Sequence, residues 1–364
     1  MTELPRSLPA FEARFPDEAA CARWLLGKRW PDGFRCPACG HDEAWELGRE
    51  RLTLQCAACE RQVSVTAGTV LHGSHLGLRT WFPAAWLVAT HRNGMSARQL
   101  WLQLGLGSYK TAWLLAQKLR RSMVDPEREP LKGVVEIDQS EMPFRADETF
   151  FEITKSGTML VIGAVEIVDH TTKKPQDPKR FGAKYLDTMS GRVRLAAIPS
   201  NEATHIHAFI KANIAPGTTL VSDGHASYLG LADYRHDPRV VGSMAGHVPL
   251  KWIHRVFALL KRWSLGTYHG LRRQHIDSYL NEFVFRYNRR FYRHVSFETV
   301  LGLATRHGPV AYWDIIERKN PRKASPTIRR QPRHRKTASG FRQDGARTSN
   351  SADPSSGNEP GTTE

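Results

Sequence analysis

Two acidic residues of this 364-residue chain follow strand-like segments, Asp138 after VVEI and Asp223 after TTLVS. Carboxylate oxygens are the ligands that Mg²⁺ and Mn²⁺ prefer. Two such ions about 3.5 to 4 Å apart can activate a water or a hydroxyl and stabilise the leaving oxygen of a phosphodiester. If the two strands are neighbours, the pattern predicts such a site. Taken alone, either acid fits a solvent-facing strand end, and SDG around Asp223 is also an ordinary turn sequence.

Four of the five cysteines form two CxxC pairs, Cys36 with Cys39 and Cys56 with Cys59, and sixteen residues separate the pairs. This spacing is typical of a four-cysteine zinc site. Four thiolates complete a tetrahedron and leave no open position, so the predicted zinc is structural. Four unrelated buried cysteines are the alternative. Cys21 lies in a helix-like segment, EAACARWLLGKRW, and is expected to be a core thiol.

The segment between the cysteine pairs alternates like a hairpin strand. Its expected buried face consists of Trp45, Leu47, Leu52 and Leu54. The β-rich stretch 64–72 (SVTAGTVLH) is expected to extend this sheet, and residues 81–91 to form a buried helix. His72 and His75 have metal-like spacing, but four cysteines already satisfy one zinc, so we interpret both as loop histidines.

Residues 96–121 predict two helices joined by a glycine-containing turn, with Ser96 and Ser108 as N-caps. Such a pair is typical of a helix-turn-helix, in which the amino-terminal end of the second helix enters the major groove of DNA. Simple packing of two helices is the alternative. The expected DNA contacts are Ser108, Tyr109, Lys110, Lys118, Arg120 and Arg121.

The pattern changes to strands after a proline-containing linker at 124–133. VVEID, MLVIGAVEIVD and GRVRLAAIPS read as three strands, NEATHIHAFIKANIA as a helix, and TTLVS as a fourth strand that ends at Asp223. Three strands, a helix and a fourth strand follow one another in a ribonuclease-H-like sheet. We therefore expect an α/β domain with a mixed sheet.

The charge of the chain points to a polyanionic partner. Lys and Arg number 52 against 36 Asp and Glu, so the net charge is +16 and the pI is about 9.9. Nucleic acid is the favoured partner, and a basic tail on a neutral globule is the alternative. Residues 318–364 are basic and then rich in Ser, Pro and Gly, which predicts a disordered tail that contacts phosphates or is inert. No signal peptide or membrane-length apolar run is recognisable, so we expect a soluble, cytoplasmic protein without membrane contacts.

Several segments in combination resemble bacterial insertion-sequence transposases of the IS1595 (ISXO2-like) group. They are CPACG with CAAC, SVTAGTVLH, GMSARQLWLQLGLGSYKTAWLLAQKLR, VVEID, LVSDGHASY, HVPLKWIHRVFALLKRWSLGTYHG and YLNEFVFRYNRR, between Phe15 and Arg306. The resemblance implies a zinc ribbon, a helix-turn-helix and a ribonuclease-H-like DDE domain. It further implies cutting and joining of double-stranded DNA at the terminal repeats and target of a mobile element, as a homo-oligomer at the nucleoid. Asp138 and Asp223 then match the first two catalytic acids and hold Mg²⁺ or Mn²⁺.

The third metal-binding position departs from this resemblance. It is expected in the helix WIHRVFALLKRW, at Leu259, and leucine has no atom that binds Mg²⁺. A substitute is Glu282, or Asp277, one helix further on, although Glu282 could instead form a surface ion pair with Arg286.

His254 and Lys261, two helical turns apart, share one face of the WIHRVFALLKRW helix. They either contact the DNA backbone, which makes Lys261 a further candidate DNA-binding residue, or form a polar stripe beside the core.

The sequence thus predicts four regions: a zinc ribbon with its flanking helix at 15–75, a helix-turn-helix region at 76–125, a transposase domain at 132–306 and a disordered tail at 318–364. Three functions are compatible with them: an active transposase, a catalytically decayed or co-opted relative that binds DNA through its zinc ribbon, and a zinc-ribbon regulator.

Overall fold

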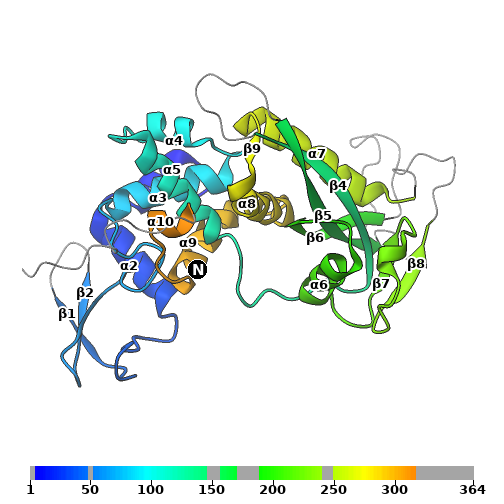
Figure 1. Ribbon diagram of the computed structural model, residues 1–364. Coiled ribbons are helices and arrows are strands. Elements are labelled where there is room, and N and C mark those ends of the chain that lie inside the picture. Colours follow the sequence, from blue (N-terminus) through cyan, green and yellow to red (C-terminus); the bar gives the residue numbers. More distant parts are fainter. Residues whose placement is uncertain (1–4, 48–51, 146–155, 170–187, 240–248, 317–364) are drawn as a thin grey trace, which may run out of the picture. The chain divides into compact units, whose positions relative to one another are not determined.

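The computed structural model describes residues 5–47, 52–145, 156–169, 188–239 and 249–316. It contains a small ribbon, a group of helices and a larger sheet (Figure 1). In this described part, no helix is long and apolar enough to cross a membrane. The predicted disordered tail at 318–364 lies outside the described residues.

Three antiparallel strands in sequential order form the ribbon: β1 (Ala44–Leu47), β2 (Thr53–Cys56) and β3 (Gln62–Ser64). Leu52 and Leu54 are buried, as predicted. Trp45 is 69% exposed, so its assignment to the buried face was wrong. The reason is the strand register, which pairs Trp45 with Gln55 on the polar face. Of the stretch 64–72, only Ser64 belongs to β3, and the rest forms turns.

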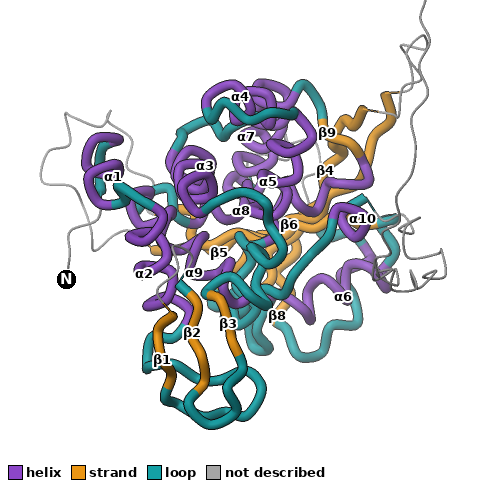
Figure 2. Tube along the Cα trace, turned by 90° about the vertical axis from the view of Figure 1, so that its left-hand side faces the viewer, coloured by secondary structure: helices purple, strands orange, loops and turns teal. Residues whose placement is uncertain are grey.

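A single core joins helices from both ends of the described chain (Figure 2). Phe297 shows this best, because its ring contacts those of Phe15, Trp24 and Phe82 at centroid distances of 5.6 to 5.8 Å. The helix that carries Phe297 was assigned from sequence to the transposase domain, and residues Met1–Lys319 instead form one compact unit. The helices are α1 (Leu8–Arg14), α2 (Glu18–Arg29), α3 (Leu78–Thr90), α4 (Ala97–Gln103), α5 (Tyr109–Arg121) and α9 (Ser296–Arg306).

Helices α4 and α5 begin where the sequence predicts. Ser96 and Gln99 form a capping box at α4, and the Ser108 side chain accepts a hydrogen bond from the Lys110 amide at α5. Gly105 between them has φ +57°, a left-handed conformation that favours glycine. The local sequence therefore specifies two helices and a tight turn.

The larger sheet has the order β6-β5-β4-β7-β8, with β5 antiparallel to β4 and β6, and with β7 and β8 parallel to β4. Asp138 lies inside β4 and not at its end, which corrects the sequence-based boundary, because pairing with β5 carries β4 on to residue 145. The elements are β4 (Val134–Arg145), β5 (Ser156–Asp169), β6 (Thr188–Ile198), α6 (Ala203–Asn213), β7 (Thr219–Ser222), β8 (Arg235–Pro238), α7 (Lys251–Tyr268), β9 (Leu271–Arg272) and α8 (Ile276–Asn288). Short helical segments are α10 (Tyr312–Ile315) and the 3₁₀ turns at 226–228, 273–275 and 293–295.

Helices cover both faces of this sheet, α7 and α8 on one and α6 on the other (Figure 1). Side chains alternate between the faces along a strand, so Val135 and Ile137 pack toward α6 while Met142 packs toward α7. Gly163, the β5 partner of Asp138, lets α7 approach closely. A β-carbon there would lie 2.9 Å from the Ile253 side chain.

A buried ion pair joins α5 to α8. Arg120 Nε donates to Glu282 Oε2 over 2.7 Å, and the two side chains are 1% and 0% exposed. Tyr268 donates its hydroxyl hydrogen to the same carboxylate, and Arg120 Nη2 donates to the Tyr268 oxygen. Glu282 therefore forms no surface pair with Arg286, whose guanidinium donates to main-chain carbonyls of 88 and 91 instead.

We expect Glu282→Gln to lower the free energy of unfolding by about 3 to 5 kcal/mol, because it leaves the Arg120 charge buried without its partner. Glu129→Gln is the matched control, since Glu129 is 73% exposed and pairs at the surface with Lys132 and Arg192, and such pairs contribute about 1 kcal/mol or less. Urea denaturation of both variants measures the difference. Equal losses in the two variants would contradict the assignment.

Candidate functional site

The four paired cysteines meet at one point of the ribbon. Their sulfur atoms all lie within 4.8 Å of one another. The Cys36–Cys59 and Cys39–Cys56 sulfurs are 3.7 and 3.5 Å apart. Thiolates bound at 2.3 Å to one tetrahedral zinc lie about 3.8 Å apart, so the four residues fit a zinc ion.

Two matching turns position these sulfurs. In the first, the Gly40 amide donates to the Cys36 carbonyl, and in the second the Glu60 amide donates to the Cys56 carbonyl. Gly40 and Glu60 both have positive φ angles, +77° and +57°. The backbone amides of residues 38 and 39 point at the first sulfur and lower the pKa of Cys36 to about 6, which favours the metal-binding thiolate. Cys21 stands apart as a buried core thiol, as predicted, and burial raises its pKa to about 12.

Asp138 lies in β4, and Asp223 directly follows β7, the neighbouring parallel strand. Glu136 of β4 pairs with Val221 of β7, so the same register carried two residues further sets Asp138 opposite Asp223. Asp138 is 8% exposed and Asp223 is half-buried. Burial, together with the negative charges of Asp223 and Glu136, raises the pKa of Asp138 to about 6, although the Gln139 amide donates to it.

His254 of α7 faces this pair of acids. Its Nε2 atom lies 3.3 Å from Asp138 Oδ2. On the other side, Tyr228 accepts a hydrogen bond from the Gln139 side chain. Burial, followed by the nearby charges of Asp138 and Asp223, raises the pKa of Tyr228 well above its usual value. An imidazole and a neutral phenol thus flank the carboxylates.

Glu136 positions the helix that carries His254. Its carboxylate accepts hydrogen bonds from the amides of Trp252 and Ile253 over 2.7 and 2.8 Å, at the amino terminus of α7. The positive end of a helix dipole stabilises an anion there. Burial nevertheless outweighs these bonds and raises the pKa of Glu136. Sequence reasoning missed this residue, and its signal was an acid two positions before Asp138 on the same strand face.

Comparisons with known proteins agree with this arrangement. A family model described as a transposase zinc-ribbon domain matches residues 16–62, and one described as an ISXO2-like transposase domain matches residues 130–288. The chain belongs to the ISXO2-like transposase family. This family assignment confirms the resemblance, and the second match contains both acids, His254 and the Arg120 partner Glu282.

A curated relative points the same way over a shorter length. The uncharacterized protein in transposable element ISH50 of Halobacterium salinarum is 34% identical over 127 residues, which cover 34% of this chain and 42% of that protein. The matched part thus spans less than half of the relative. No solved structure matches the chain.

The three residues named from sequence for the third metal position have different surroundings in this ISXO2-like chain. Leu259 is 39% exposed on α7. Glu282 holds Arg120 and Tyr268 with both of its oxygens, so its assignment as a catalytic residue is corrected here. Asp277 is exposed in the first turn of α8. The α7 side chain that touches Asp138 is His254.

The predicted DNA contacts divide into accessible and buried residues. Tyr109, Lys110 and Arg121 are exposed, and Ser108 and Lys261 are half-buried. The other two predictions are corrected, because Lys118 is 8% exposed and Arg120 is 1% exposed. Both lie where the last turns of α5 are buried, and Arg120 is bonded to α8. His72 and His75 are exposed in turns, which agrees with their interpretation as loop histidines.

We expect Cys56→Ser to abolish zinc binding, because one of the four converging ligands is lost. Cys21→Ser is the control, since Cys21 is an equally buried thiol outside the cluster. Zinc content per chain after gel filtration, measured by mass spectrometry, distinguishes the two. Full zinc content in Cys56→Ser would refute the site.

The raised pKa of Asp138 predicts that the metal-free protein loses stability as pH rises from about 4 to about 6. Below the unfolded value both states are protonated, whereas above about 6 the folded protein holds an unfavourable buried carboxylate. At roughly 1.4 kcal/mol per pKa unit, the loss is about 2 to 3 kcal/mol. Asp138→Asn should therefore be more stable than wild type at pH 7.5, with a gap that narrows toward pH 4.5. Urea titrations across this range test the prediction, and a gap independent of pH would contradict it.

Proposed function

We propose that this chain is an insertion-sequence transposase that binds the ends of its element and catalyses strand cleavage and transfer with Mg²⁺ or Mn²⁺. The observation that carries the proposal is the convergence of Asp138, Asp223 and His254 from two neighbouring strands and one helix. The ISXO2-like transposase match across the same residues supports it.

A ribonuclease-H-like fold of the larger sheet is part of this proposal. Its support is the strand order. Strands β6, β5 and β4 are antiparallel neighbours, and β7 and β8 continue the sheet on the other side of β4, parallel to it. That order places β4 beside β7 although β5, β6 and α6 intervene in sequence. This order would bring the two acids together.

Asp138, Asp223 and His254 would hold the cations. Bound there, divalent ions would stabilise the charge that develops on the attacking and leaving oxygens of a phosphodiester. Among the described residues, the cysteines are the one group of three or more potential ligands that meet within 4.8 Å, so the acids and His254 must draw closer to share an ion. Imidazole suits softer metals than Mg²⁺, and the donor set therefore favours Mn²⁺.

The protein's own groups prepare this site. Glu136 anchors the amino terminus of α7 on the sheet and so places His254 beside Asp138. The Gln139 side chain donates to Tyr228, and this bond closes the side of the site opposite α7. Both contacts are rigid supports for metal ligands, and such partners typically change metal affinity or activity by about 10- to 100-fold when lost.

DNA binding is assigned to the zinc ribbon, the helix pair α4–α5 and the basic surface. Exposed Tyr109, Lys110 and Arg121 on α5 and a net charge of +16 support this assignment. Cleavage at two element ends requires two active sites, so we expect a homo-oligomer on DNA.

A catalytically decayed relative that only binds DNA is the second candidate. Leu259 motivates it, because an aliphatic side chain supplies no ligand. His254 beside Asp138 weakens this motive, since a ligand is present without Leu259. A zinc-ribbon regulator is less compatible with the ISXO2-like transposase match over residues 130–288.

We expect the zinc-loaded full chain to nick DNA that carries the ends of its element, faster with Mn²⁺ than with Mg²⁺. Asp223→Asn and His254→Ala should each slow nicking by about 100-fold or more, because each removes a metal ligand. Leu259→Ala, an exposed change on the same helix, is the control and should keep wild-type activity.

Three outcomes separate the candidates. No nicking by the wild type with DNA binding intact would favour the DNA-binding candidate. Nicking that survives in His254→Ala would remove this residue from the site. Loss of nicking in Leu259→Ala would return the third position to residue 259.

A further inference from the structure

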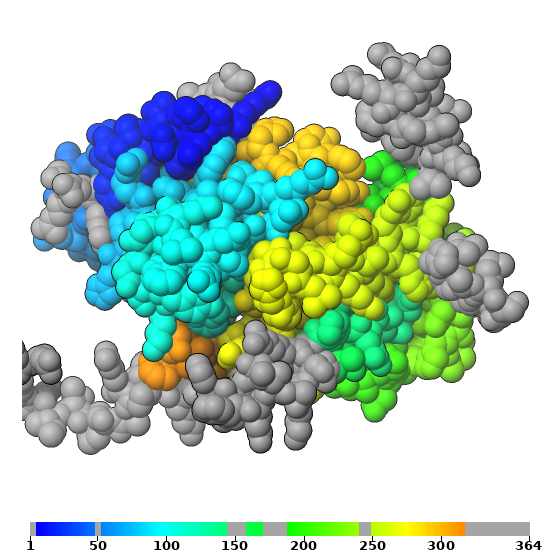
Figure 3. Space-filling model, turned by 90° about the horizontal axis from the view of Figure 1, so that it is seen from above, coloured from blue at the N-terminus to red at the C-terminus, as the bar shows by residue number. Residues whose placement is uncertain are grey.

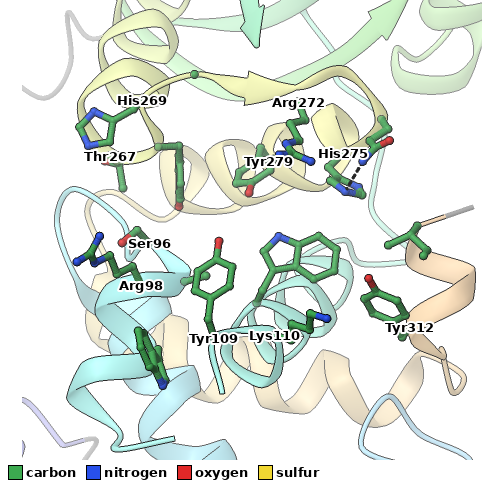
Figure 4. A pocket seen from close by; sticks show the side chains of 17 residues that line it. Ser96, Arg98, Tyr109, Lys110, Thr267, His269, Arg272, His275, Tyr279 and Tyr312 are labelled. Carbon is green, nitrogen blue, oxygen red and sulfur yellow. Dashed lines mark hydrogen bonds between the residues drawn. The ribbon is translucent and has the colours of Figure 1, made fainter. Parts of the chain in front are cut away.

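A second site lies between α4–α5 and the segment that joins α7 to α8. It is a groove of about 970 Å³, and Figure 4 shows its two walls facing each other. One wall carries Arg98, Tyr109 and Lys110, and the other carries Thr267, His269 and Arg272. Figure 3 shows the cyan surface of α4–α5 beside the yellow surface of the end of α7, which agrees with a groove lined by residues from both.

The charge of the groove has one sign. Arg98, Lys110 and Arg272 line it together with two histidines, and none of the described residues that line it is Asp or Glu. Low-dielectric walls with one sign of charge concentrate ligands of the opposite sign. The groove is therefore suited to a polyanion.

Aromatic rings make up half of the remaining lining: Trp101, Tyr109, Trp113, Tyr268, Tyr279 and Tyr312. Tyr109 is 49% exposed and Tyr312 is 36% exposed. Figure 4 shows Tyr109 pointing from α5 across the groove toward Tyr279 and Arg272. Exposed rings beside cations are the features with which proteins hold single strands, because each unpaired base can stack on a ring while its phosphate meets a cation.

The floor of the groove is rigid. The rings of Tyr268 and Tyr279 pack edge to face, with their centroids 4.8 Å apart. The buried Arg120 guanidinium lies 5.3 Å from the Tyr268 centroid and 4.3 Å from the Tyr279 centroid. The Arg120–Glu282 ion pair holds this guanidinium in place. Rings fixed before binding lose little conformational freedom when a base stacks on them.

The size of the groove selects the form of the nucleic acid. A volume of about 970 Å³ is at the upper end of the range for small-ligand pockets, roughly 300 to 1,000 Å³. Its size therefore matches a short run of unpaired nucleotides better than a turn of duplex. This differs from the predicted role of Tyr109 and Lys110, which placed them in the major groove.

The groove lies at the opposite end of α7 from the acids. His254 is near the start of this helix and Tyr268 ends it, fourteen residues later, which corresponds to about 21 Å at 1.5 Å per residue. That distance is about six base steps of a B-form strand. The groove therefore meets DNA beside the cleaved phosphodiester and not the phosphodiester itself.

We propose that this groove binds a short unpaired stretch of DNA next to the cleavage site, with bases stacked on Tyr109 and its facing rings and phosphates held by Lys110 and Arg98. The proposal deepens the proposed function, because it names the form of DNA that the transposase holds beside its acids.

Binding of fluorescein-labelled oligo-dT to the zinc-loaded full chain tests the proposal by fluorescence anisotropy without added Mg²⁺ or Mn²⁺. We expect Tyr109→Ala to weaken binding by roughly 5- to 100-fold, the range for loss of one stacked base. Tyr109→Phe should keep most of the affinity because it keeps the ring. Tyr292→Ala is the matched control, since Tyr292 is 64% exposed and does not line the groove.

A charge pair of variants adds an independent readout. Lys110→Gln should weaken oligo-dT binding and reduce its salt dependence, whereas Lys211→Gln, which changes an exposed residue of α6, should do neither. Circular dichroism melting of Tyr109→Ala shows whether the fold is kept. If Tyr109→Ala has a lower melting temperature than the wild type, the test rests on the other two variants. Tyr109→Phe is then expected to keep the affinity for oligo-dT, and Lys110→Gln to lower it.

Several results would overturn the assignment. They are no binding of oligo-dT, equal affinity of Tyr109→Ala and Tyr292→Ala, or an equal loss of duplex and oligo-dT binding in Tyr109→Ala. The nicking assay is separate from this test. If the wild type does not nick DNA but gives the expected oligo-dT results, the proposed enzyme activity is refuted and the groove assignment stands.

Discussion

The carboxylate of Glu136 at the amino terminus of α7 is the contact on which the candidate active site depends. Two backbone amides of the helix donate to it, and Gly163 on the next strand leaves room for the helix to lie close to the sheet. His254 reaches Asp138 because α7 begins at this point. The cost is a concentration of negative charge in a buried place, which contributes to the raised pKa of Asp138. A cation bound among these groups would relieve that charge, so the charge that destabilises the metal-free site is the same charge that would attract a metal.

A second buried contact, Arg120 with Glu282, connects the two halves of the described unit. It joins α5, which carries the exposed candidate DNA contacts, to α8 and through Tyr268 to the end of α7. The helix that begins beside the acids thus ends in the wall of the basic and aromatic groove. The exposed residues of α5 and the carboxylate of Asp138 are therefore linked through one continuous set of packed elements.

Local sequence was sufficient for features that depend on neighbouring residues. The cysteine spacing predicted the cluster, and Ser96, Ser108 and Gly105 predicted where two helices begin and where the chain turns. Predictions of burial and exposure failed where packing between distant parts of the chain decides them. Trp45 is exposed because of strand register, and the basic Lys118 and Arg120 are buried because α5 packs against the rest of the unit. A charged residue at a helix end looks the same in sequence whether it meets solvent or a buried carboxylate.

The sequence by itself determined the zinc-ribbon cysteines, the two helices that begin at Ser96 and Ser108, the net positive charge and the two acids, because each follows from residue type and short spacing. Only the tertiary structure decided which side chain accompanies the acids. Leu259 and Glu282 were the sequence candidates, but the direction of α7 on the sheet turns His254 toward Asp138, and packing of α5 on α8 commits Glu282 to Arg120. Those directions depend on contacts between residues more than a hundred positions apart, such as Glu136 with Ile253, which no local pattern records.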